Sequence, residues 1–153
     1  MGGADAPIAD LWKTQVRELA RYVNATRGDP IPEGMLAVKP SAELSEAQNP
    51  ERGGGDPFQF DYHDKLLYKM VELRRYPETI LADFAAGRLE QVLGLAAGET
   101  VVGTFFPDAG AFVADLELVW RRFKGSFFKR VQAPPIVAVS KRAFGFDLRE
   151  AQI

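Results

Sequence analysis

The sequence of 153 residues contains no cysteine and only one histidine, His63. Without cysteine, the chain cannot form disulfide bonds, zinc sites built from thiolates or cysteine nucleophiles. With one histidine, it cannot form an iron or zinc site that needs two. We therefore expect no metal site and no cofactor, and the sequence singles out no catalytic residue.

Long apolar runs are also absent. No stretch approaches the roughly 18 consecutive apolar residues that a membrane-spanning helix needs. The first six residues lack the basic region and apolar run of a secretory signal. We expect a cytoplasmic protein without a transmembrane segment.

Motifs that carry chemistry are scarce. Ser126 and Lys129 match S-x-x-K, but the companion motifs of penicillin-recognising enzymes are missing. The glycines at 53–55 are followed by Asp56 and Pro57, whereas a phosphate-binding P-loop requires Gly-Lys-Ser or Gly-Lys-Thr. The sequence therefore favours a protein that is not an enzyme.

His63 keeps one enzymatic alternative open. It lies between Asp61 and Asp64, and a carboxylate beside an imidazole can serve as a general base. The same acids also suit the polar first turn of a helix, where they interact favourably with the helix dipole. A small enzyme or ligand-binding domain centred near His63 remains an alternative.

Charge is unevenly distributed along the chain, although the net charge is only −2. Residues 120–153 contain eight Lys and Arg against two acids, a balance of +6. The other residues then carry 11 basic and 19 acidic groups, a balance of −8. Such asymmetry indicates either an anionic partner or attraction between the two regions.

The segment from Trp120 to Arg130 interleaves aromatic and basic residues. Surfaces that stack bases and neutralise phosphates have this composition. The aromatic residues also continue a helical stripe from Phe112 and Leu116, which favours their burial. We predict that four cations form an exposed patch for an acidic protein surface, such as that of a second copy of the chain: Arg121, Arg122, Lys124 and Lys129. A nucleic acid is the less favoured partner.

Apolar periodicity predicts helices over 8–23, 62–86 and 110–124, with Pro77 dividing the second into two helices. Runs of β-branched and aromatic residues predict strands over 100–106, 136–140 and 143–147, and a short apolar run at 35–38 is compatible with a further strand. The expected fold class is α+β, with helices packed on a small, mainly antiparallel sheet. We expect a single domain over 1–153, with an irregular arm at about 24–60 that is rich in proline and glycine.

These patterns favour a non-enzymatic binding or structural subunit of a larger assembly. The reasons are the scarcity of chemical motifs, the long arm and the opposed charges. Besides the site near His63, the alternative is a nucleic-acid-binding accessory protein that uses the basic region at 120–142.

Overall fold

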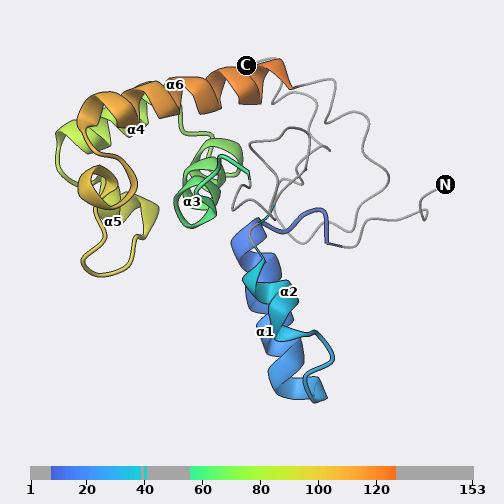
Figure 1. Ribbon diagram of the computed structural model, residues 1–153. Helices are drawn as coiled ribbons and strands as arrows, with labels where there is room; N and C mark the ends of the chain where they lie inside the picture. The colour runs from blue at the N-terminus through green and yellow to red at the C-terminus, as the bar shows by residue number, and fades with distance from the viewer. Residues whose placement is uncertain (1–7, 39, 41–55, 127–153) are drawn as a thin grey trace. The chain divides into compact units, whose positions relative to one another are not determined.

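The computed structural model describes residues 8–38, 40 and 56–126. These residues are predominantly helical and separate into two compact units. One unit comprises residues within 12–61, and the other comprises the described residues before and after them. Figure 1 shows the helices of both units. No helix in the described part of the chain is long and apolar enough to cross a membrane.

The unit within 12–61 contains α1 (Lys13–Arg27) and the short α2 (Glu33–Ala37). Gly28 ends α1 in the left-handed conformation at φ 77°, and its N–H donates to the carbonyl of Asn24. The Asn24 side chain then fixes the following turn, because it donates to the Ile31 carbonyl and accepts from the Ile31 N–H, at 2.8 and 2.9 Å. No residue of α1 or α2 is buried.

The other unit is built from α3 (Phe60–Val71), α4 (Pro77–Ala85), α5 (Leu89–Leu93) and α6 (Ala109–Gly125). The first two residues of α3, Phe60 and Asp61, are assigned to the unit within 12–61. Apolar side chains from all four helices are buried. They include Tyr62, Leu66, Met70, Val71, Ile80, Leu89, Leu93, Phe112, Leu116, Val119 and Phe123.

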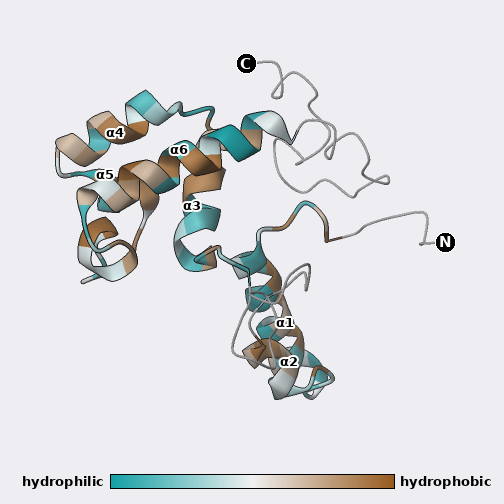
Figure 2. Ribbon diagram, turned by 45° about the horizontal axis from the view of Figure 1, so that its top comes forward, coloured by the Kyte–Doolittle hydropathy of each residue, from teal (hydrophilic) through white to brown (hydrophobic). Residues whose placement is uncertain are grey.

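Local signals explain where the helices of this unit begin and end. Pro77 occupies the first position of α4, where a proline loses no helical hydrogen bond. Asp108 caps α6, because its carboxylate accepts a hydrogen bond from the Ala111 N–H at 2.8 Å. Figure 2 shows apolar and polar residues alternating around α6, as in an amphipathic helix.

The predicted α+β fold is wrong, because the described residues contain no strand. Residues 101–105 of the predicted strand form an irregular π-helical turn, η3 (Val101–Phe105). Gly103 has φ 108°, and this allows the Phe106 N–H to reach back to the Val101 carbonyl at 3.0 Å. Val101 and Phe106 are buried, so the apolar pattern indicated burial correctly but not conformation.

Other predicted elements have different bounds or lie elsewhere. Residues 35–37 of the possible strand at 35–38 belong to α2, and α1 begins later and ends later than the predicted helix over 8–23. The expected arm at 24–60 includes the end of α1, all of α2 and the start of α3. The predicted strands over 136–140 and 143–147 lie outside the described residues.

Candidate functional site

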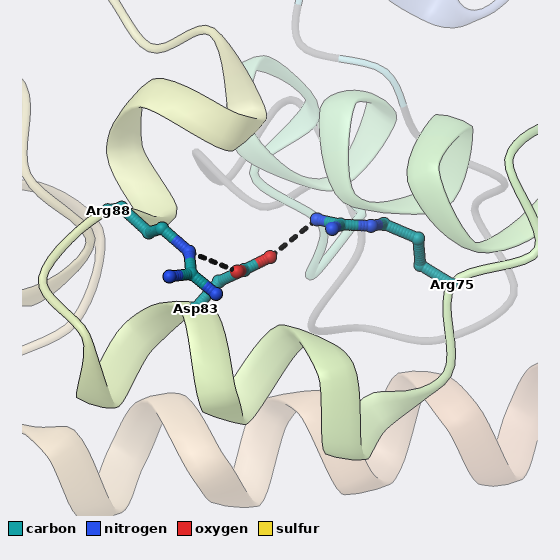
Figure 3. A network of polar contacts seen from close by, with 3 residues as sticks. All are labelled: Arg75, Asp83 and Arg88. Carbon is teal, nitrogen blue, oxygen red and sulfur yellow. Dashed lines mark hydrogen bonds and ion pairs between the residues drawn. The ribbon is translucent and has the colours of Figure 1, made fainter.

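A cluster of one carboxylate and two guanidinium groups lies beside α4. Asp83 is 1% exposed, and its two oxygens accept hydrogen bonds from different arginines. The Nη1 of Arg75 donates to Oδ2 at 2.5 Å, and the Nε of Arg88 donates to Oδ1 at 2.7 Å. Figure 3 shows the two arginines reaching Asp83 from opposite sides. The cluster joins the turn before α4 to the turn after it.

The two arginines keep Asp83 ionised in spite of its burial. The hydrogen bond from Arg88 has the largest effect and lowers the pKa of the carboxyl group below its ordinary value. Burial acts in the opposite direction, and the charge and hydrogen bond of Arg75 lower the pKa further. One carboxylate therefore compensates one of two positive charges, and the cluster retains a net charge of +1.

A second polar contact joins α3 to α6. The Nε2 of His63 lies 3.2 and 3.1 Å from the two carboxylate oxygens of Asp115. His63 is buried, whereas the Asp115 side chain is 20% exposed. The sequence predicts a carboxylate beside His63 from its neighbours Asp61 and Asp64, and the structure places its ring against the carboxylate of Asp115, 52 residues further along the chain. A pair of this kind could hold or transfer a proton.

The hydroxyl of Tyr62 lies close to this pair but is not satisfied. Tyr62 is buried, and its hydroxyl has no hydrogen-bond partner in the described part of the chain. Its ring packs against the rings of His63, Phe105 and Phe106, with centroids 5.0 to 5.4 Å away. Burial, followed by the negative charge of Asp115, raises the pKa of the phenol well above its usual range. The phenol therefore stays protonated at neutral pH.

The predicted partner-binding residues lie at the C-terminal end of α6, except Lys129, which is outside the described residues. Arg121 and Arg122 are exposed. Lys124 is half-buried, and its Nζ lies over the Trp120 ring, 5.7 Å from the ring centroid. The structure thus places two of the four cations on the surface and the third against an aromatic ring.

Trp120 also joins α6 to the start of α4. Its ring lies edge-on to the ring of Tyr76 at 5.9 Å and stacks on Phe123 at 5.7 Å. Phe123 is buried and Trp120 is half-buried, which agrees with the predicted aromatic stripe. Packing of α6 therefore uses the aromatic residues, and the arginines beside them face solvent.

No group of three or more potential metal ligands occurs within the described ranges. The predicted absence of metal ligands and cofactors concerns the whole chain and stays a prediction.

Comparison with known proteins identifies the family. The family model described as NAD synthase matches residues 1–100. The chain belongs to the NAD synthase family. The matched residues include α1 to α5, and therefore His63 and the Asp83 cluster, but not α6.

Individual proteins similar to this chain are also NAD(+) synthetases. An NH(3)-dependent NAD(+) synthetase from Chlorobium phaeovibrioides (strain DSM 265 / 1930) is 42% identical over 83 residues, covering 54% of this chain and 27% of the relative. A glutamine-dependent NAD(+) synthetase from Xanthomonas campestris pv. campestris (strain 8004) is 32% identical over 151 residues, covering 97% of this chain and 22% of the relative. The chain thus spans about a quarter of the length of these relatives. No solved structure matches.

The family corrects the functional predictions. A non-enzymatic binding or structural subunit was expected, and this is wrong because the family is one of enzymes. The alternative of a nucleic-acid-binding accessory protein is overturned for the same reason. The third alternative placed an enzymatic site near His63, and that location stays a prediction.

Sequence reasoning did not anticipate the clusters around Asp83 and Asp115. The cluster around Asp83 is formed by residues close in the chain, Arg75 and Arg88. An acid followed five residues later by an arginine is too common a spacing to predict such a cluster. The contact between His63 and Asp115 bridges 52 residues, so no local pattern could reveal it.

Proposed function

We propose that this chain takes part in the synthesis of NAD+ with ammonia as the nitrogen donor. The observation that carries this proposal is the match of the NAD synthase family model to residues 1–100. The relatives from Chlorobium and Xanthomonas, whose names specify ammonia or glutamine as the donor, support it. The proposal includes a cytoplasmic location, which fractionation of cells would test.

The names of the relatives define the type of reaction. Ammonia supplies one nitrogen, and NAD+ contains a carboxamide on its pyridine ring. The acceptor is therefore the corresponding carboxylate, in which a carbon–oxygen bond breaks as the carbon–nitrogen bond forms. Because a carboxylate oxygen is a poor leaving group, the acceptor must first be activated, and a nucleoside triphosphate is the class of co-reactant suited to this step.

The composition of the chain favours ammonia over glutamine as the donor that it handles directly. Release of ammonia from glutamine through a thiol nucleophile requires a cysteine, and this chain has none. Addition of free ammonia needs no protein nucleophile. In the proposal, a relative that uses glutamine releases the ammonia outside the segment that corresponds to this chain.

A chimaeric enzyme tests the proposal. The segment of the Xanthomonas enzyme that aligns with this chain, which covers 97% of the chain, is replaced by this sequence. NAD+ is then measured with ammonia and, separately, with glutamine as the donor. A Gly/Ser linker of equal length in the same place is the matched control. We expect NAD+ formation above that of the linker control; a folded chimaera that forms no more than the control would contradict the proposal.

We also propose that the exposed end of α6 contacts an acidic protein surface, such as that of a second copy of this chain. Two observations support this: Arg121 and Arg122 are exposed, and the chain outside 120–153 carries a balance of −8. Exposed ion pairs contribute only about 0–1 kcal/mol each, so the aromatic residues beside them must contribute to a stable contact.

Charge reversal tests this second contact. Arg121→Glu with Arg122→Glu should weaken self-association, measured by sedimentation across a salt series, and Arg17→Glu with Arg21→Glu on α1 is the matched control. Equal association by both double variants would contradict a contact at α6. Loss of a steep, salt-dependent affinity for nucleic acid would identify a nucleic acid, not a protein, as the partner.

A further inference from the structure

The Asp83 cluster contains more positive charge than its carboxylate requires. Both oxygens of Asp83 are already engaged, one by Arg75 and the other by Arg88. In the described part of the chain, neither guanidinium group has another hydrogen-bond partner. A guanidinium group carries several N–H donors, so most of the donors in this cluster make no hydrogen bond to another residue that the structure describes.

Arg88 presents its unused donors to solvent. Its side chain is 58% exposed, whereas that of Arg75 is 31% exposed. Because Arg88 binds Asp83 through Nε, its two terminal nitrogens remain available as a pair. This pair matches the spacing of two oxygens in a phosphate or carboxylate group and can bind them together.

The main chain holds Arg88 in place before any ligand arrives. Its N–H donates to the carbonyl of Asp83 at 3.1 Å, while its side chain binds the carboxylate of the same residue. Asp83 is buried and is itself fixed by Arg75. An arginine restrained in this way loses less conformational freedom on binding than a free one, which favours an anion.

We propose that Arg88 binds a phosphate group, with Asp83 orienting its guanidinium group and Arg75 supplying the additional positive charge. The bound group belongs to a phosphate-bearing small molecule or is free phosphate, because both present the same oxygens. The inference does not depend on NAD+ synthesis, since it concerns binding by this chain alone.

Titration of the 153-residue chain with inorganic phosphate tests the proposal. Phosphate is added at constant ionic strength, with chloride as the balancing anion, and binding is followed by the phosphorus NMR signal and by calorimetry. We expect saturable binding that Arg88→Gln weakens by about tenfold or more, because a charge-assisted, two-point contact is lost. Arg88→Lys should restore only part of the affinity, since an ammonium group lacks the paired nitrogens. Arg21→Gln, on the exposed side of α1, is the control and should bind as the unaltered chain does.

Pyrophosphate and NAD+ are titrated in parallel to separate the possible sources of the phosphate group. Stronger binding of either than of phosphate, lost in Arg88→Gln, would identify a phosphate-bearing molecule. Stronger binding of phosphate than of the other two, lost in the same variant, would identify free phosphate. Binding that does not saturate, or that Arg88→Gln leaves unchanged, would overturn the proposal and leave the cluster as a link between α4 and α5. Either result leaves the chimaera assay unaffected, so failure of this inference is distinguishable from failure of the proposed function.

Discussion

The helices α1 and α6 differ in burial although similar patterns predict them. Both have apolar residues at three- and four-residue steps. In α6, the residues of this stripe at Phe112, Leu116 and Val119 are buried, whereas α1 has no buried residue and Leu19 is 42% exposed. An amphipathic pattern thus determines which face of a helix is apolar, but it does not determine what that face contacts.

The largest expected effect contrasts these two helices directly. Phe112→Ala should reduce the free energy of unfolding of the α3–α6 unit by about 3–5 kcal/mol, because a fully buried ring leaves a cavity. Leu19→Ala should change the stability of its own unit by less than about 0.5 kcal/mol. The chain's two tryptophans, Trp12 and Trp120, lie in different units. Unfolding in urea is therefore followed by fluorescence of Trp120 in a Trp12→Phe background for the α3–α6 unit, and of Trp12 in a Trp120→Phe background for the other unit. Equal losses in the two units would contradict the difference in burial.

The second prediction concerns how the stability of the α3–α6 unit depends on pH in the acid range. The pKa of Asp83 is lower in the folded state than its ordinary value of 3.8, so its contribution to stability is present above that value. The contribution is lost as the pH falls through the lower, folded-state pKa. Asp83→Asn should therefore reduce stability at pH 7 and make the loss of stability shallower as the pH falls below the ordinary value of 3.8.

Urea midpoints at a series of pH values, in the Trp12→Phe background, measure this effect. Asp108→Asn is the control, because an asparagine also caps a helix and Asp108 lies outside the cluster. If the urea midpoint of Asp83→Asn falls with decreasing pH as steeply as that of the unaltered chain, Asp83 is not the group that makes stability depend on acid.

The third prediction concerns the unsatisfied hydroxyl in the core of the same unit. Tyr62→Phe should increase stability by about 1 kcal/mol, because it removes a buried polar group without a partner and keeps the ring. Tyr76→Phe is the control, since Tyr76 is 41% exposed and its hydroxyl is not among the buried groups without a partner. A stability loss in Tyr62→Phe would show that a water or another group satisfies the hydroxyl.

The smallest expected effects compare the ends of the two helices. Gly28→Ala should destabilise the end of α1 by about 1 kcal/mol, because φ 77° is unfavourable for a side chain. Gly125→Ala in the last turn of α6 should stabilise by about 0.5–1 kcal/mol, since an added Cβ meets nothing within 4 Å and alanine favours a helix. Hydrogen exchange of backbone amides near each site measures both changes in local stability. Changes of the same sign in the two variants would contradict the predicted difference between the helix ends.

Much of the helical structure could be predicted from the sequence, because its signals are local. Pro77 and Asp108 mark helix starts, and Gly28 marks a helix end, through interactions within a few residues. The turn at 101–105 could not be predicted, since a short apolar run is typical of a buried strand and of other buried segments alike. Its conformation depends on Gly103 at φ 108° and on the return of the chain at Phe106.

The candidate site was less predictable than the helices. The clustering of Arg121 and Arg122 predicts an exposed patch, and both side chains are exposed, but their contact with a partner stays a prediction. The pairing of His63 with Asp115 depends on how α3 packs against α6, which no local spacing encodes. The enzymatic family was also not evident, because the chain holds no complete catalytic motif of its own.

Incorporation of labelled nitrogen tests the central claim of NAD+ synthesis most directly. The chimaera with the Xanthomonas enzyme is supplied with nitrogen-15 ammonium as its only nitrogen donor, and the NAD+ formed is analysed by mass spectrometry. The account predicts NAD+ that carries the heavy nitrogen in its carboxamide, above the level of the linker control. A folded chimaera whose NAD+ contains no heavy nitrogen would contradict it.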